Sequence, residues 1–215
     1  MLFIGSNHAS SKATILNAWL VNMPQILLSF CYLNINTICT AMACAQEWNT
    51  FGTTRKGLRV TDPAGEQRST YFLQLPYKWA MPLLIVSGTL HWLLSQTFFL
   101  VRVDYYDRNL ELKSNDSRAA CGISFSSLIV FFCVTFGLVL AIRVVGRRRL
   151  HPKIPSAECC SLIISAACHP LNDEIEPHLN RVQWGVVEHE VQEGYAHCTL
   201  SARAVKRPEV GKRYH

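Results

Sequence analysis

The chain has 215 residues, of which 49% are hydrophobic, and 21 Lys and Arg stand against 15 Asp and Glu. Its charges are unevenly placed, because segments 22–45, 79–101 and 121–145 together contain one charged residue, Arg143. Each segment is longer than the ~18 apolar residues that indicate a membrane-spanning helix. The sequence therefore excludes a soluble globular domain and a disordered chain.

The predicted elements follow from these apolar segments. Within the first loop, DPAG at 62–65 is a turn signal between β-favouring residues, which predicts a short hairpin. The predicted domains are a short N-terminal segment (1–21), a transmembrane domain (22–145) with spans at about 22–45, 79–101 and 121–145, and a cytoplasmic tail (146–215).

Lys and Arg residues predict the orientation of the spans. Loop 46–78 and the stretch Arg143–Lys153 hold five each, residues 1–21 hold one and loop 102–120 holds four. Because positive residues accumulate on the cytoplasmic side, loop 46–78 and the tail are predicted to be cytoplasmic. The sequon at Asn115 then lies in the loop assigned outside and is a candidate glycosylation site.

The tail, residues 146–215, contains six of the eight histidines and several short apolar runs. The run 196–205 alternates apolar and polar residues, which indicates strands. About 50 residues are few for an independent hydrophobic core, so we expect the tail to pack against the membrane domain or against a partner. The predicted fold class is an all-α membrane protein, a three-span transmembrane helical bundle with a small β-containing cytoplasmic tail.

A polar face follows the first predicted span. Its members are Asn22, Gln25, Ser29, Tyr32 and Asn36. Steps of three and four residues place them on one side of an α-helix. Amide and hydroxyl groups are costly against hydrocarbon, so this face contacts protein or water. Two interpretations remain open: hydrogen bonds between helices, which we favour, and a substrate or ion path.

The second predicted span repeats the pattern with Ser87, His91 and Ser95. A histidine inside a membrane is a candidate functional residue, because it can relay a proton or bind a metal. No second His, Asp or Glu lies in the predicted spans to complete such a site. A neutral His91 that is hydrogen-bonded across helices fits the pattern equally well.

Two mirrored pairs in the tail, Cys168-His169 and His197-Cys198, contain the residue types of a tetrahedral zinc site. Adjacent residues of a strand point to opposite faces, so each pair offers only one ligand to a given site. Paired strands with buried thiols are therefore the favoured interpretation. We expect no metal and no cofactor.

The sequence contains no GxSxG, HExxH, P-loop or GxGxxG motif, and no paired carboxylates lie in the spans. We therefore expect no enzyme. The favoured function is a non-enzymatic membrane scaffold or subunit, and the alternative is a transporter or channel-like fragment with a polar path formed by the first and second spans. The expected partners are the lipid bilayer and other transmembrane helices of the same or a partner chain, without nucleic acid. The expected location is an integral, multi-pass position in the plasma membrane or an endomembrane.

Residues 57–102, GLRVTDPAGEQRSTYFLQLPYKWAMPLLIVSGTLHWLLSQTFFLVR, resemble a family of fungal multi-pass membrane proteins that share a domain of unknown function. The resemblance continues in 22–48 and in the tail segments ISAACHP (164–170), VQWGVV (182–187) and GYAHCTLS (194–201). It implies a multi-pass membrane protein, with this chain corresponding to the C-terminal half of longer members. It implies no catalytic or binding residue.

Overall fold

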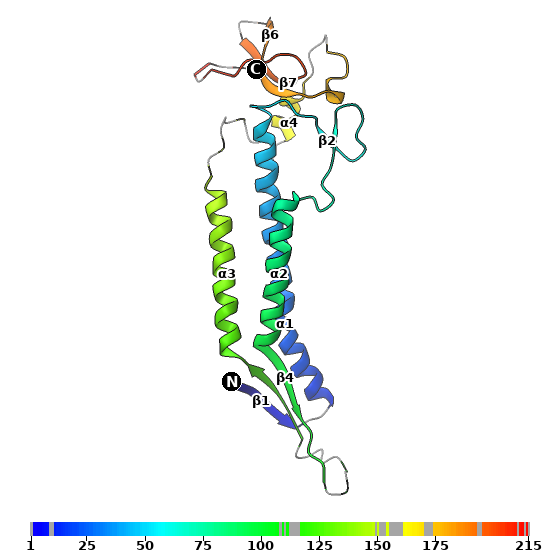
Figure 1. Cartoon of the computed structure of the whole chain (residues 1–215), viewed down its shortest axis with the longest axis vertical. Coiled ribbons are helices and arrows are strands. Elements are labelled where there is room, and N and C mark those ends of the chain that lie inside the picture. The colour runs from blue at the N-terminus through cyan, green and yellow to red at the C-terminus, as the bar shows by residue number, and fades with distance from the viewer. Residues whose placement is uncertain are drawn as a thin grey trace. The chain divides into compact units, whose positions relative to one another are not determined.

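The computed structural model describes residues 2–8, 11–107, 109, 111, 117–148, 150, 154, 161–169, 174–192, 195–209, 211, 212 and 214. The chain divides into two units. Unit 1 contains Met1–Ile38 and Lys78–Arg147, and unit 2 contains Cys39–Tyr77 and Arg148–His215. One long helix, α1 (Ser11–Thr50), continues from unit 1 into unit 2 (Figure 1).

Three long helices occupy most of the apolar sequence: α1, α2 (Tyr77–Thr97) and α3 (Phe125–Gly146) (Figure 1). Polar residues are accommodated inside α1 because their side chains bond to the carbonyl four residues earlier. Asn34 Nδ2 donates to Phe30 O at 2.8 Å, and Thr37 Oγ1 donates to Leu33 O at 3.0 Å. Such bonds satisfy a polar side chain without a second helix.

A three-stranded antiparallel sheet joins the helices of unit 1. Its strands are β1 (Leu2–His8), β4 (Phe98–Val103) and β5 (Arg118–Ile123), in the order β1-β5-β4. The strand β4 follows α2 directly and β5 leads into α3 (Figure 1). Ser124 N donates to Thr97 O at 2.9 Å, which ties the end of α2 to the start of α3.

The pairing of β4 with β5 depends on a glycine. Gly122 lies opposite Phe99, and a Cβ at Gly122 would come within 2.4 Å of the Phe99 ring. Near the start of β5, Ala119 is fully buried. Just before β5, the buried Ser117 Oγ accepts a hydrogen bond from Tyr105 N at 3.1 Å. The sheet is therefore closely packed at its centre strand.

Unit 2 is built around a small core. Its elements are β2 (Arg59–Val60), β3 (Arg68–Ser69), α4 (Ser161–Ala167), the 3₁₀ helix η1 (Pro177–Leu179), β6 (Gln183–Gln192) and β7 (Tyr195–Ser201). The core consists of Phe51, Val182 and Leu200, with Trp48, Leu58 and Trp184 packed against them. Phe51 comes from the first predicted loop and the other two buried residues from the tail, so loop and tail share one core.

The prediction of an all-α, three-span bundle is wrong. Among the described helices, only Lys12–Thr50 and Phe125–Gly146 are long and apolar enough to cross a membrane. The described residues also form three small sheets. The predicted span 79–101 turns into β4 at Phe98, and the span 121–145 begins inside β5. An apolar run alone does not distinguish a helix from a buried strand.

The predicted hairpin in the first loop also differs from the structure. The strands β2 and β3 are parallel, with Arg59 opposite Arg68. The turn between them is held by the tail, because Glu66 N donates to Leu179 O at 2.8 Å. Gly65 in this turn has a φ of +58°, and a Cβ there would lie 2.7 Å from the same carbonyl oxygen. The contact with Leu179, which is distant in sequence, thus holds this turn, and the predicted antiparallel hairpin does not form.

Candidate functional site

The polar face of α1 meets α2 at one hydrogen bond. Gln25 Oε1 and His91 Nδ1 lie 3.2 Å apart, and both side chains are half-buried. Because Oε1 is an acceptor, His91 donates from Nδ1, and in the neutral ring Nε2 is left as an acceptor. This bond brings together one predicted residue from each of the two polar faces.

Other residues of the two faces bond to their own helices. Asn22 Nδ2 donates to Ala18 O at 2.8 Å, and Ser29 Oγ donates to Gln25 O at 3.1 Å. Both side chains are exposed. On α2, Ser95 Oγ donates to Trp92 O at 2.7 Å. Asn36 is half-buried. The predicted faces therefore do not form one continuous row of bonds between helices.

A cavity of about 360 Å³ lies within unit 1, between α1, α2 and α3. Two of the predicted residues, Tyr32 and Ser87, line it. Apart from their hydroxyls, the Thr135 hydroxyl and the Cys31 thiol, the lining consists of apolar side chains. Thr135 Oγ1 already donates to Phe131 O at 2.8 Å. The arrangement suits an apolar molecule better than a hydrated ion.

Sequence reasoning missed the buried Asn17 at the sheet end of α1. Its Nδ2 donates to Ala119 O at 3.3 Å, and its own carbonyl accepts from Cys121 Sγ at 3.6 Å. Asn17 lies before the first predicted span, so the spacing that defines the polar face does not reach it. These bonds fix α1 to the centre strand β5.

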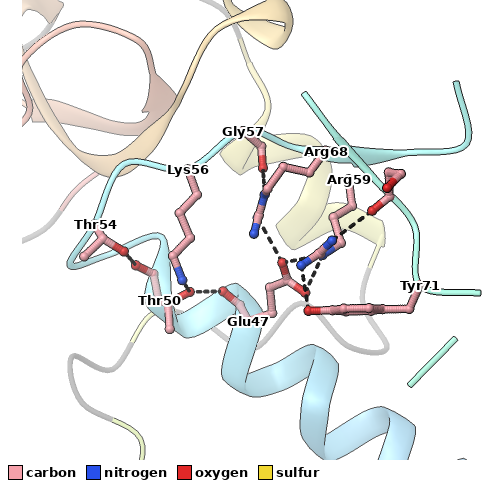
Figure 2. A network of polar contacts seen from close by, with 9 residues as sticks. Glu47, Thr50, Thr54, Lys56, Gly57, Arg59, Arg68 and Tyr71 are labelled. Carbon is pink, nitrogen blue, oxygen red and sulfur yellow. Dashed lines mark hydrogen bonds and ion pairs between the residues drawn. The ribbon is translucent and has the colours of Figure 1, made fainter. Parts of the chain in front are cut away.

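Sequence reasoning also missed a charged cluster at the end of α1, shown in Figure 2. Glu47 accepts from Arg59 Nε at 2.8 Å and from Arg68 Nη2 at 2.9 Å. Arg59 also donates to the Tyr71 hydroxyl at 2.6 Å and lies 3.9 Å above the centre of the Tyr71 ring. The guanidinium of Arg68 donates from Nε to Gly57 O at 2.9 Å.

The last turn of α1 extends the same network (Figure 2). Lys56 Nζ donates to Thr50 Oγ1 at 3.0 Å, and that hydroxyl donates to Glu47 O at 2.6 Å. All these partners belong to unit 2. Since the Glu47 carboxylate is paired with two guanidinium groups, the cluster holds the loop to the helix rather than offering a reactive group.

The Cys and His pairs of the tail lie near one another without forming a metal centre. The rings of His169 and His197 are 6.2 Å apart, and Cys168 is exposed. Within the described ranges, no group of three or more His, Cys, Asp or Glu is arranged to hold a metal ion. Cys198 lines a cavity of about 350 Å³ with Trp48 and Trp184, and burial raises the pKa of its thiol to about 11. Its thiolate is therefore scarce at neutral pH.

The candidate glycosylation site, Asn115, lies outside the described residues.

Comparison with known proteins gives one match. A family model described as "Domain of unknown function (DUF8419)" matches residues 7–193. No curated protein and no solved structure matches the chain.

Proposed function

Since the chain belongs to the DUF8419 family, whose function is unknown, we propose its function from the geometry alone. We propose a non-enzymatic, multi-pass integral membrane protein that acts as a scaffold or subunit. Its partners are the lipid bilayer and other transmembrane helices. The fungal origin that the resemblance implies stays a prediction.

The observation that carries this proposal is the surface of α3. None of its residues is buried, although nearly all are apolar. Ile129 and Phe136 expose more than 60% of their surface, and neither lines the cavity between the helices. A helix that is hydrophobic on all sides belongs in a large core or in a membrane. The described structure supplies no such core around α3, so a bilayer is the environment that fits it.

The helix α1 supports the same conclusion. Ile26, Phe30 and Leu33 expose more than half of their surface, and none of the three lines the cavity between the helices. This surface suits contact with lipid or with another apolar helix. The bond between Gln25 and His91 links α1 to α2.

The bonding of the polar face favours assembly over transport. Asn22 Nδ2 and the hydroxyl of Ser29 each donate a hydrogen bond to a carbonyl of their own helix, so these two bonds do not require water. The cavity between the helices has a mostly apolar lining. Both features support a scaffold more than a transporter with a polar path.

Extraction from membranes with alkaline carbonate tests the proposal. We expect the full-length chain to stay in the membrane pellet. Replacing Leu140 in α3 by Arg costs about 2.5–3.5 kcal/mol if that position lies at the centre of a span, and the soluble or degraded fraction then rises. Ser165→Arg on the exposed side of α4 is the matched control and should leave the pellet unchanged. Release of the unmodified chain by carbonate would refute the proposal.

A further inference from the structure

Three hydroxyl groups line the cavity of unit 1, and those of Tyr32 and Ser87 come from different helices. Tyr32 comes from α1 and Ser87 from α2, and both line the cavity. In the part of the chain that the structure describes, neither hydroxyl forms a hydrogen bond. Neighbouring hydroxyls behave differently, because those of Ser29, Thr89 and Thr135 donate to carbonyls of their own helices.

We propose that this cavity binds one uncharged lipid with a single hydroxyl group, of the sterol class, whose hydroxyl bonds to Tyr32 and Ser87. The inference rests on the proposed function, because a bilayer is the source of such a molecule. The cavity volume, about 360 Å³, lies within the ~300–1,000 Å³ range of small-molecule sites, which combine apolar walls with a few polar groups.

The walls define the body of the ligand. Leu83, Leu90 and Leu94 are buried on α2 yet line the cavity, and Phe131 and Phe132 line it from α3. A rigid apolar ligand gains dispersion contacts with such side chains and loses little conformational entropy on binding. A fused-ring lipid meets both conditions better than a flexible acyl chain.

The charges of the lining define the head of the ligand. No Lys, Arg, Asp or Glu lines the cavity, so a carboxylate, phosphate or ammonium group would be buried without a counter-ion. A hydroxyl group needs no counter-ion, and it can donate one hydrogen bond and accept others. In an apolar surrounding, the hydroxyls of Tyr32 and Ser87 are costly until they have such a partner.

Photolabelling of the full-length protein in lipid nanodiscs tests the proposal. The probes are a diazirine-bearing cholesterol, its analogue without the hydroxyl, and a diazirine-bearing palmitate. We expect saturable labelling of the cavity residues by the sterol probe, which unlabelled cholesterol reduces at least fivefold. Saturable labelling by palmitate that cholesterol does not displace would overturn the proposal.

Two substitutions separate cavity binding from general lipid contact. Leu90→Trp fills the cavity and should reduce sterol labelling at least fivefold. Leu84→Trp, on the same helix but 44% exposed and outside the lining, is the matched control and should label as the unmodified protein does. Equal labelling of these two variants would overturn the proposal. If the Leu90→Trp variant does not assemble, Ser87→Leu replaces it as a smaller substitution that also fills part of the cavity.

The hydroxyls are tested by the double variant Tyr32→Phe with Ser87→Ala. We expect about a fivefold loss of sterol labelling, the effect of one to two hydrogen bonds, and no loss with the analogue that lacks the hydroxyl. An equal loss with both probes would overturn the role given to the hydroxyls. Carbonate extraction of the same variants keeps this test separate from the proposed function, because retention in the pellet does not depend on the cavity.

Discussion

His91 donates from Nδ1 to Gln25 Oε1 at 3.2 Å, and this bond links α2 to α1. Both side chains are half-buried, and the two residues come from the two polar faces that the sequence singles out. The bond also fixes the proton of a neutral His91 on Nδ1. The bond positions α2 against α1. Removing it therefore tests directly how much it contributes to the pairing of the two helices.

Replacing Gln25 by Leu should weaken the pairing of α1 with α2. Hydrogen bonds between transmembrane helices contribute about 0.6 kcal/mol, up to about 2 kcal/mol. The loss is measured by unfolding in mixed detergent micelles, with His91→Leu and the double variant completing a thermodynamic cycle. Ser29→Ala is the control, because that hydroxyl bonds within its own helix. Strictly additive effects of the two single variants would show that the bond carries no energy.

Cysteines placed on the polar face should be unreactive towards aqueous thiol reagents. We expect Ser29→Cys and Asn36→Cys to resist a small charged methanethiosulfonate in native membranes, because the scaffold gives this face no water path. Modification is read from each peptide by mass spectrometry in permeabilised cells. Ala64→Cys, at an exposed position in the loop after α1, is the reactive control. Ready modification at both positions in an assembled protein would favour transport.

The charged cluster of unit 2 should stabilise the loop after α1. Glu47→Gln removes the charge that pairs with Arg59 and Arg68, whose side chains are 24% and 33% exposed. Because the pairs are partly exposed, we expect a loss of about 1 kcal/mol and faster proteolysis within residues 55–77. Glu66→Gln, which breaks a longer and more exposed pair with Arg181, should change proteolysis far less. Similar rates for both variants would contradict this assignment.

Gly122→Ala should disrupt the sheet of unit 1. The added Cβ would come within 2.4 Å of the Phe99 ring, so the strands or the ring must shift. Overpacking of this kind costs about 1–3 kcal/mol. Gly137→Ala in α3 is the matched control, since a Cβ there meets nothing within 4 Å, and it should leave stability unchanged or slightly higher. Thermal unfolding of the two variants compares them, and equal melting temperatures would argue against tight packing at Gly122.

Cys198 should react slowly with alkylating reagents until the pH is high. Burial raises the pKa of its thiol to about 11 from an ordinary value of 9.0. The folded state thus holds the proton more tightly than the unfolded state, and this contribution to stability is complete below pH 9.0 and lost as the pH rises to about 11. Iodoacetamide labelling between pH 7 and 11 measures the titration. Rapid labelling of folded protein at pH 7 would contradict it.

The sequence identifies the apolar segments correctly but not their ends. Residues 98–101 and 121–123 are as apolar as the helices beside them, yet they pair with each other in β4 and β5. A helix and a buried strand have the same hydrophobic content. Only the presence of a partner strand therefore decides which of the two these residues form. Gly122 permits the close approach of Phe99 but gives no strand signal of its own, because glycine is depleted in strands.

The candidate site could be predicted only in part, for a related reason. The spacing of polar residues assigns Gln25 and His91 to a polar face of each helix, but spacing alone does not identify the residue that each one bonds to on the other helix. The count of Lys and Arg residues that predicts the orientation treats Arg59 and Arg68 as unpaired positive charges. Both are instead paired with Glu47, which the same count ignores.

The position of β1 in the sheet has a consequence for the order of biogenesis. Leu2 pairs with Ile123 and His8 with Arg118, so β1 has no sheet partner until β5 has been synthesised. The ribosome makes α1, α2 and β4 in the meantime. A long loop must then close, which makes this pairing slow compared with helix formation. Within unit 1, β1 therefore joins its sheet only after α1, α2 and β4 have been made, and its pairing completes a sheet between helices that are already formed.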